Sequence, residues 1–140
     1  MTTTFAKTSI SASLARDLVA KAEDEAVALN VRICVAIVDE SGLLKHFSRM
    51  DGAPLLAIEL AKDKAWTAVS FGISTDQWHE FIKNDPPLLV GIPKVPSLIV
   101  FGGGCPIRLN GEVIGGIGVS GGHYSQDMKC AEAALELVGT

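Results

Sequence analysis

The sequence lacks the features that mark several large classes of proteins. Among its 140 residues, no apolar run approaches the roughly 20 residues that span a bilayer, so we expect no membrane segment. The formal net charge is −4 and no basic run occurs, which argues against nucleic acid and anionic membranes as partners. The N-terminal stretch has no basic region followed by an apolar one, so we expect no signal peptide and a cytoplasmic location.

Metal-binding and redox motifs are also missing. The cysteines, Cys34, Cys105 and Cys130, lie far apart and form no CxxC pair, so we expect three reduced thiols. His79 lies in the run Trp-His-Glu-Phe, which is not the zinc motif HExxH, and we expect this histidine on the surface. We expect His46 at a sheet edge or facing solvent.

The composition is sufficient for one hydrophobic core. Hydrophobic residues make up 48% of the chain and charged residues 20%, which is typical of a globular protein and not of a disordered one. A chain of 140 residues has the length of one domain, so we expect residues 1–140 to form a single domain.

Nine of the fourteen glycines lie in one stretch: Gly102, Gly103, Gly104, Gly111, Gly115, Gly116, Gly118, Gly121 and Gly122. Within it, Asn110-Gly111 predicts a type I′ hairpin that joins strands near 105–109 and 112–119. At period two, one face of the second strand carries Val113, Gly115, Ile117 and Val119, and the other carries Ile114, Gly116, Gly118 and Ser120. The second face is nearly bare beyond Ile114, so we expect a helix, a partner subunit or a ligand to pack closely on it.

The hydrophobic pattern predicts four helices and five strands. We expect helices at about 11–30, 54–72, 74–83 and after 122, and strands at 33–38, 43–49, 98–101, 105–109 and 112–119. Hairpins join most of these strands, so we expect an α+β fold with a mainly antiparallel sheet flanked by helices. The connection 84–97 is rich in proline and apolar residues, which is typical of a lid or a subunit contact.

Several motifs occur in the order found in a known family: Val38-Asp39-x-x-Gly42, Arg49-Met50-Asp51-Gly52-Ala53, Ala61-x-x-Lys64-Ala65, Gly103-Gly104-x-Pro106-Ile107, Asn110-Gly111-Glu112-Val113-Ile114-Gly115, and Gly118-Val119-Ser120-Gly121-Gly122 with Asp127. With these motifs the chain resembles the GlcG/HbpS-like family, also called the haem-degrading domain family. Relatives of this family include the C-terminal domain of a cobalamin adenosyltransferase. The resemblance runs from about Ser11 to Val138, nearly the whole chain.

This resemblance implies profilin-like α/β/α layers with a five-stranded antiparallel sheet. It also implies homo-oligomers, from dimers to octamers. Some members of the family bind haem, and many belong to catabolic operons and have no established activity.

The chain departs from the family pattern at the start of the last helix. Many members have Thr-Pro after Ser-Gly-Gly, whereas this chain has His123-Tyr124. His123 is therefore a candidate ligand for haem iron or another metal, or an acid or base near pH 7. The alternative is a solvent-exposed residue that caps the helix in place of threonine.

Other polar residues have two interpretations each. Lys64 either extends along apolar surface to solvent or reaches an anion at the turn Ser120-Gly121-Gly122, which we call the glycine turn. Asp39 and Asp51 either bond nearby backbone N–H groups in turns or take part in acid–base chemistry. An ion pair between Arg49 and an aspartate would fix the hairpin.

Three functional hypotheses follow. The first is a homo-oligomeric protein, accessory to a catabolic pathway, that binds haem or another anionic small molecule through Lys64, Arg49, Gly103, Gly104, Ser120, Gly121, Gly122 and His123, with His123 as the iron ligand if haem binds. The second is a cofactor-independent lyase or isomerase in which His123 and either Asp51 or Asp39 move protons on a carboxylate substrate. The third is an assembly protein whose glycine face builds the oligomer.

Overall fold

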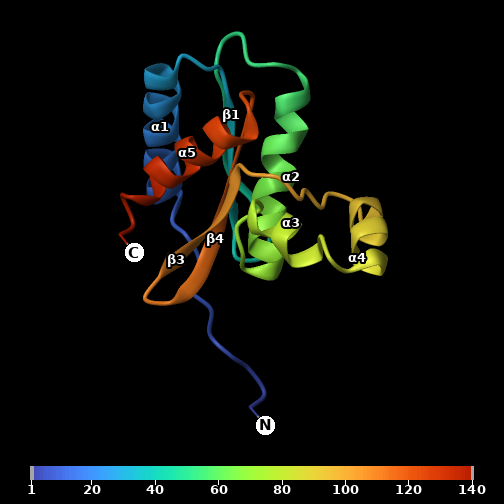
Figure 1. Ribbon diagram of the computed structural model, residues 1–140. Coiled ribbons are helices and arrows are strands. Elements are labelled where there is room, and N and C mark those ends of the chain that lie inside the picture. Colours follow the sequence, from blue (N-terminus) through green and yellow to red (C-terminus); the bar gives the residue numbers. More distant parts are fainter. Residues whose placement is uncertain (1, 140) are drawn as a thin grey trace.

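Four antiparallel strands form one sheet, in the order β2–β1–β4–β3, in a computed structural model that describes residues 2–139 (Figure 1). The helices are α1 (Ala12–Leu29), α2 (Leu56–Phe71), α3 (Gln77–Ile82), α4 (Pro86–Gly91) and α5 (Tyr124–Leu135), and the strands are β1 (Cys34–Asp39), β2 (Leu44–Arg49), β3 (Gly104–Leu109) and β4 (Glu112–Ser120). The predicted α+β class and the antiparallel sheet are confirmed. Residues 1 and 140 of the predicted domain lie outside the described residues.

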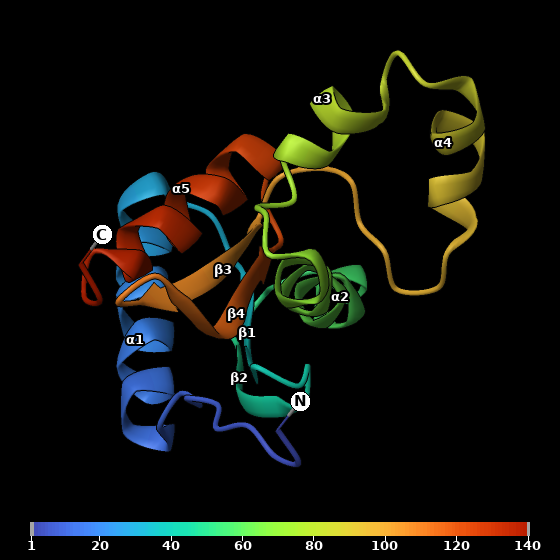
Figure 2. The same cartoon turned by 90° about the horizontal axis from the view of Figure 1, so that it is seen from below.

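Helices cover both faces of the sheet (Figure 2). Helices α1 and α5 pack on one face over a large core that includes Leu18, Ile37 and Ile117. Helix α2 packs on the other face over a smaller core, in which Ala57, Ala61 and Ala65 meet β1. None of the helices within residues 2–139 is long and apolar enough to cross a membrane.

The predicted hairpin is confirmed, and a bulge follows it. Asn110 and Gly111 have φ of 52° and 79°, as a type I′ turn requires. The ladder then shifts register, because Arg108 pairs with Val113 whereas Ile107 pairs with Gly115. Ile114 is therefore an extra residue in β4, and it packs in the core under α1 and α5. The prediction that Ile114 shares a face with the bare glycines is wrong, because the bulge breaks the period-two alternation.

The bare face of β4 is covered by α2. A methyl group added to Gly118 would overlap the carbonyl oxygen of Ala61, and one added to Gly116 would meet the carbonyl oxygen of Ala65 at 2.6 Å. The helix backbone therefore rests directly on the strand, which only glycine on one side and alanine on the other permit. The hypothesis that a partner subunit occupies this face is wrong, because the same chain fills it.

The fifth predicted strand, at 98–101, is absent from the described residues. The N–H group of Ile99 donates to the Thr67 hydroxyl oxygen at 3.0 Å, and Leu98 N–H donates to the Val95 carbonyl at 3.2 Å. Two backbone donors of this apolar run are thus used by α2 and by a local turn, and not by a neighbouring strand. The segment is a connection that leads into β3.

The region from 74 to 97 also differs from the prediction. Helix α3 begins at Gln77 and not beside Ser74, whose carbonyl oxygen only accepts the N–H of Gln77 at 3.0 Å. The expected connection 84–97 contains α4, because Asp85 accepts the N–H of Leu88 and Pro86 takes the first helical position. Both views show α4 lying away from the sheet.

The contact between α2 and β4 generates a stability prediction. The substitution Gly118→Ala should lower the free energy of unfolding by about 3 kcal/mol, because the new methyl group forces α2 away from the sheet. Urea unfolding followed by circular dichroism measures this change. Gly91→Ala is the matched control, since an added Cβ there meets no atom within 4 Å and should leave stability unchanged or slightly raised. Equal effects of the two substitutions would contradict the account.

Candidate functional site

Lys64 is drawn into the interior because it lies on the sheet-facing side of α2. Its side chain is 1% exposed, and its Nζ donates to the Val119 carbonyl oxygen at 2.9 Å and to Asp127 Oδ2 at 3.1 Å. Of the two interpretations of Lys64, the structure therefore favours an anion at the glycine turn. The chain itself supplies that anion from α5.

The N-terminus of α5 is capped by side chains of the same chain. Asp127 Oδ1 accepts the N–H of Gly122 at 2.9 Å, and Gln126 Oε1 accepts the N–H of His123 at 3.0 Å. His123 Nδ1 accepts the N–H of Ser125 at 3.2 Å, and it lies 2.8 Å from the Ser125 hydroxyl. The backbone donors of Gly122 and His123, expected to receive a ligand anion, are therefore already hydrogen-bonded.

Burial opposes the charges of the Lys64–Asp127 pair. Burial raises the pKa of Asp127, against the attraction of Lys64 and the hydrogen bond from Gly122. Burial likewise lowers the pKa of Lys64, and the nearby Asp127 carboxylate acts in the opposite direction. Each charge is thus tolerated in the interior only because the other lies 3.1 Å away.

The other predicted carboxylates lie elsewhere. Asp39 Oδ1 accepts the N–H groups of Ser41 at 2.9 Å and Leu43 at 3.0 Å, so turn chemistry accounts for it. Asp39 pairs with Gly115, five residues along β4 from Ser120, which corresponds to about 17 Å. The structure does not bring Asp39 near the glycine turn.

Arg49 and Asp51 lie exposed at the end of β2, the edge strand on the far side of the sheet from β3. No ion pair joins them within residues 2–139. Gly103, Gly104 and Ser120 are buried, and Gly104 N–H donates to the Thr75 hydroxyl at 2.9 Å. Most of the predicted site residues therefore lie together around the end of β4: Lys64, Gly103, Gly104, Ser120, Gly122 and His123. Arg49 lies at the same end of the sheet, because Cys34 pairs with both Arg49 and Ser120. None of these residues lines the two cavities described next.

Instead, a cavity of about 430 Å³ lies where α3, the connection before β3 and the start of α5 meet. It is lined by Asp76, His79, Val100, Phe101, Gly102 and Tyr124, and we call it the aromatic pocket. The rings of Phe101 and Tyr124 are 6.2 Å apart, and they are 40% and 51% exposed. The pocket thus offers two accessible aromatic rings, one imidazole and one carboxylate.

Two of the predicted residues support this pocket from outside its lining. Lys64 Nζ lies 5.2 Å from the centre of the Phe101 ring, within the range of a cation–π contact. The His123 ring stacks on Tyr124 with centroids 4.0 Å apart. The buried ion pair and the helix cap therefore hold the two aromatic walls in place.

Sequence reasoning missed most of the pocket. His79 is exposed, as predicted, but its Trp-His-Glu-Phe context gives no sign of a cavity, and no motif places Phe101 or Asp76 in one. These residues lie on three separate elements that meet only in the folded chain. The position of Tyr124 next to His123 was the one available signal.

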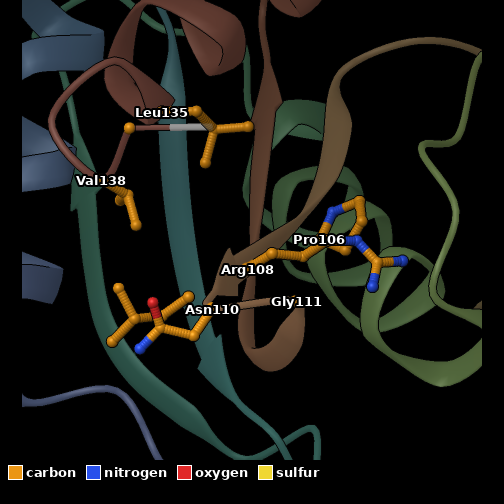
Figure 3. Close-up of a pocket in the computed structure, with 8 residues that line it drawn as sticks. Pro106, Arg108, Asn110, Gly111, Leu135 and Val138 are labelled. Atoms are coloured by element: carbon orange, nitrogen blue, oxygen red, sulfur yellow. The ribbon is translucent and has the colours of Figure 1, made fainter.

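A second cavity, of about 470 Å³, lies between the β3–β4 hairpin and the end of α5 (Figure 3). We call it the hairpin pocket; its lining includes Pro106, Leu109, Leu135 and Val138. Its one charged lining residue, Arg108, donates to the Gly72 carbonyl oxygen at 2.6 Å. Among the described residues, its lining holds no imidazole and no acidic side chain. Residues 2–139 also contain no group of three or more His, Cys, Asp or Glu side chains placed to hold a metal ion.

The chain is similar in sequence to several known proteins. The model of a family named haem degrading protein HbpS-like matches residues 10–136. The chain is 33% identical over 114 residues to Protein GlcG of Escherichia coli K12, covering 81% of this chain and 83% of that protein. It is 36% identical over 129 residues to the corrinoid adenosyltransferase PduO of Citrobacter freundii, covering 89% of this chain but 36% of PduO.

A solved structure of a PduOC:heme complex has a similar fold. Its TM-score to this chain is 0.85 at 32% identity, and the match covers 94% of this chain and 96% of that chain.

The buried ion pair generates a prediction about stability and pH. Lys64→Met keeps an unbranched side chain, one atom shorter, but leaves Asp127 buried without its partner, so the free energy of unfolding at pH 7.5 should fall by about 3–5 kcal/mol. Loss of Lys64 should raise the pKa of Asp127 further. An acid with a raised pKa in the folded state costs stability as the pH rises above its unfolded pKa of about 3.9. The deficit of the variant should therefore be smaller at pH 4.5 than at pH 7.5.

Urea unfolding at the two pH values measures this difference. The double variant Lys64→Met/Asp127→Asn has no titrating group at the site and is the control. A deficit of Lys64→Met that does not depend on pH would contradict the buried pair.

Proposed function

The chain belongs to the HbpS-like family, and from this premise we propose that it binds haem or a related tetrapyrrole in the aromatic pocket. The observation that carries the proposal is the meeting of His79, Phe101 and Tyr124 at one cavity. The solved PduOC:heme complex gives a precedent for haem binding by a relative of similar fold.

The residues of the aromatic pocket fit such a ligand. A flat macrocycle is held through its faces, and Phe101 and Tyr124 offer exposed rings for this contact. A volume of about 430 Å³ falls within the range of small-molecule sites. The carboxylate of Asp76 repels anions, so the carboxylates of the ligand would lie away from it.

Imidazole nitrogen is a common axial ligand of haem iron, and His79 lines the pocket while His123 stacks beside it. When bound, haem supplies redox and ligand-exchange chemistry at its iron. Lys64 and Asp127 would act by holding the wall of the pocket, because their charges already satisfy each other.

Location and assembly form a second part of the proposal. The thiols of Cys34, Cys105 and Cys130 are free and buried, which supports a reducing, cytoplasmic compartment. We propose a homo-oligomer with contacts through α4, which buries none of its residues and leaves Leu89 and Val90 exposed by 42% and 66%. A role accessory to a catabolic pathway stays a prediction.

Haem titration followed by absorbance tests the proposed ligand. The Soret band of wild-type protein should shift and saturate at a fixed ratio of haem to protomer. Phe101→Ala should weaken binding about tenfold, equivalent to about 1.4 kcal/mol, because one aromatic face is lost. Val138→Ala, in the hairpin pocket, is the control and should leave the titration unchanged. A titration that never saturates would remove haem from the account.

Sedimentation equilibrium tests the assembly. Val90→Lys places a charge on the exposed side of α4 and should shift the equilibrium toward smaller species at a given concentration. Val27→Lys changes an equally exposed valine on α1, 69% exposed, and should leave the assembly intact. A wild-type protein that stays monomeric at every concentration would rule the proposed oligomer out.

A further inference from the structure

We propose that His79, and not His123, provides the axial ligand to haem iron in the aromatic pocket, an inference that rests on the haem binding proposed above. The chain has three histidines, and His46 lies on β2, the edge strand farthest from β3. The choice of imidazole therefore falls between His79 on α3 and His123 at the start of α5.

The hydrogen bonds of His123 determine which of its nitrogens carries a proton. The backbone N–H of Ser125 can only donate, so Nδ1 of His123, 3.2 Å away, must accept. A neutral imidazole has one ring proton, which must then be on Nε2. A protonated Nε2 has no lone pair for iron.

Iron ligation by His123 would therefore disrupt the start of α5. A bond from Nε2 to iron requires the ring proton on Nδ1. Two hydrogen-bond donors, Nδ1–H and the N–H of Ser125, would then face each other and repel. The capping box, in which Gln126 also accepts the N–H of His123, holds the ring in its present orientation. The same ring stacks on Tyr124, so its displacement would also disturb a wall of the pocket. His123 thus positions the site, and its Nε2–H is a hydrogen-bond donor for an anionic oxygen.

The ring of His79, in contrast, takes no part in a helix cap. Its side chain is exposed and lines the pocket, and no hydrogen bond engages its ring anywhere in residues 2–139. Either ring nitrogen can hold the lone pair that iron requires, and the other can keep its proton in contact with solvent. The sulfur atoms of Cys105 and Met128 are poor alternatives, because both side chains are buried and neither lines the pocket. Burial also raises the pKa of the Cys105 thiol to about 12.

Three variants test the assignment by haem titration of the full chain. His79→Ala removes the proposed ligand at an exposed helical position where alanine preserves the fold. His123→Ser removes the imidazole but keeps a side chain that caps helices well. His46→Ala removes the remaining histidine.

We expect His79→Ala alone to lose the shifted Soret band and to raise the dissociation constant at least about tenfold. Free imidazole added to the haem-loaded His79→Ala protein should restore the band, which a merely structural effect would not allow. His46→Ala should titrate like wild type. His123→Ser should keep the shifted band but bind haem more weakly, because Tyr124 loses the ring that stacks on it.

The other outcomes overturn the assignment in distinguishable ways. Loss of the band in His123→Ser with retention in His79→Ala would make His123 the ligand. Saturable binding with an unchanged band in all three variants would exclude histidine ligation while leaving haem binding in place. A wild-type titration that does not saturate would overturn the assignment and the proposed function together.

Discussion

The direct contact between the backbone of α2 and the glycine face of β4 is the constraint on which the rest of the structure depends. Gly116 and Gly118 have no side chain, so the backbone of α2 can contact the strand directly. The alanines on this side of α2 have side chains too small to hold the helix away from the sheet. Because the helix lies so close, Lys64 has no route to solvent and must find its partners inside. It finds them in Val119 and Asp127, which ties the end of β4 and the start of α5 to α2.

This buried pair shapes the candidate site without entering it. Asp127 holds the turn before α5 through Gly122, and the ammonium group of Lys64 lies under Phe101. The Lys64–Asp127 pair therefore supports Phe101 and the turn that leads to Tyr124, although neither charged residue lines the pocket. The glycine turn resembles an anion site in sequence, but its own acid occupies it. The proposed ligand would therefore bind in the neighbouring aromatic pocket, which His79 lines.

Local signals predicted the fold well and the site poorly. Asn110-Gly111 specified the hairpin, because a type I′ turn depends on those two residues alone. The bare face of β4 predicted that something packs closely on it, but it did not distinguish a helix from a partner subunit or a ligand. The run Leu98–Phe101 has the composition of a strand, but the Thr67 hydroxyl accepts one of its N–H groups, and no local pattern reveals that partner. His79, Phe101 and Tyr124 come together only in the tertiary structure, so no local pattern predicts their pocket. The sequence pointed instead to His123, whose Nδ1 lone pair accepts a hydrogen bond within the helix cap.

The central claim is that haem binds in the aromatic pocket, and paramagnetic broadening of backbone amide resonances tests it most directly. Ferric haem added to ¹⁵N-labelled protein broadens the signals of residues near the iron. The account predicts selective broadening at Asp76, His79, Phe101, Gly102 and Tyr124, with Leu109, Leu135 and Val138 in the hairpin pocket unaffected. Broadening centred on the hairpin pocket, or spread evenly over the surface, would contradict it.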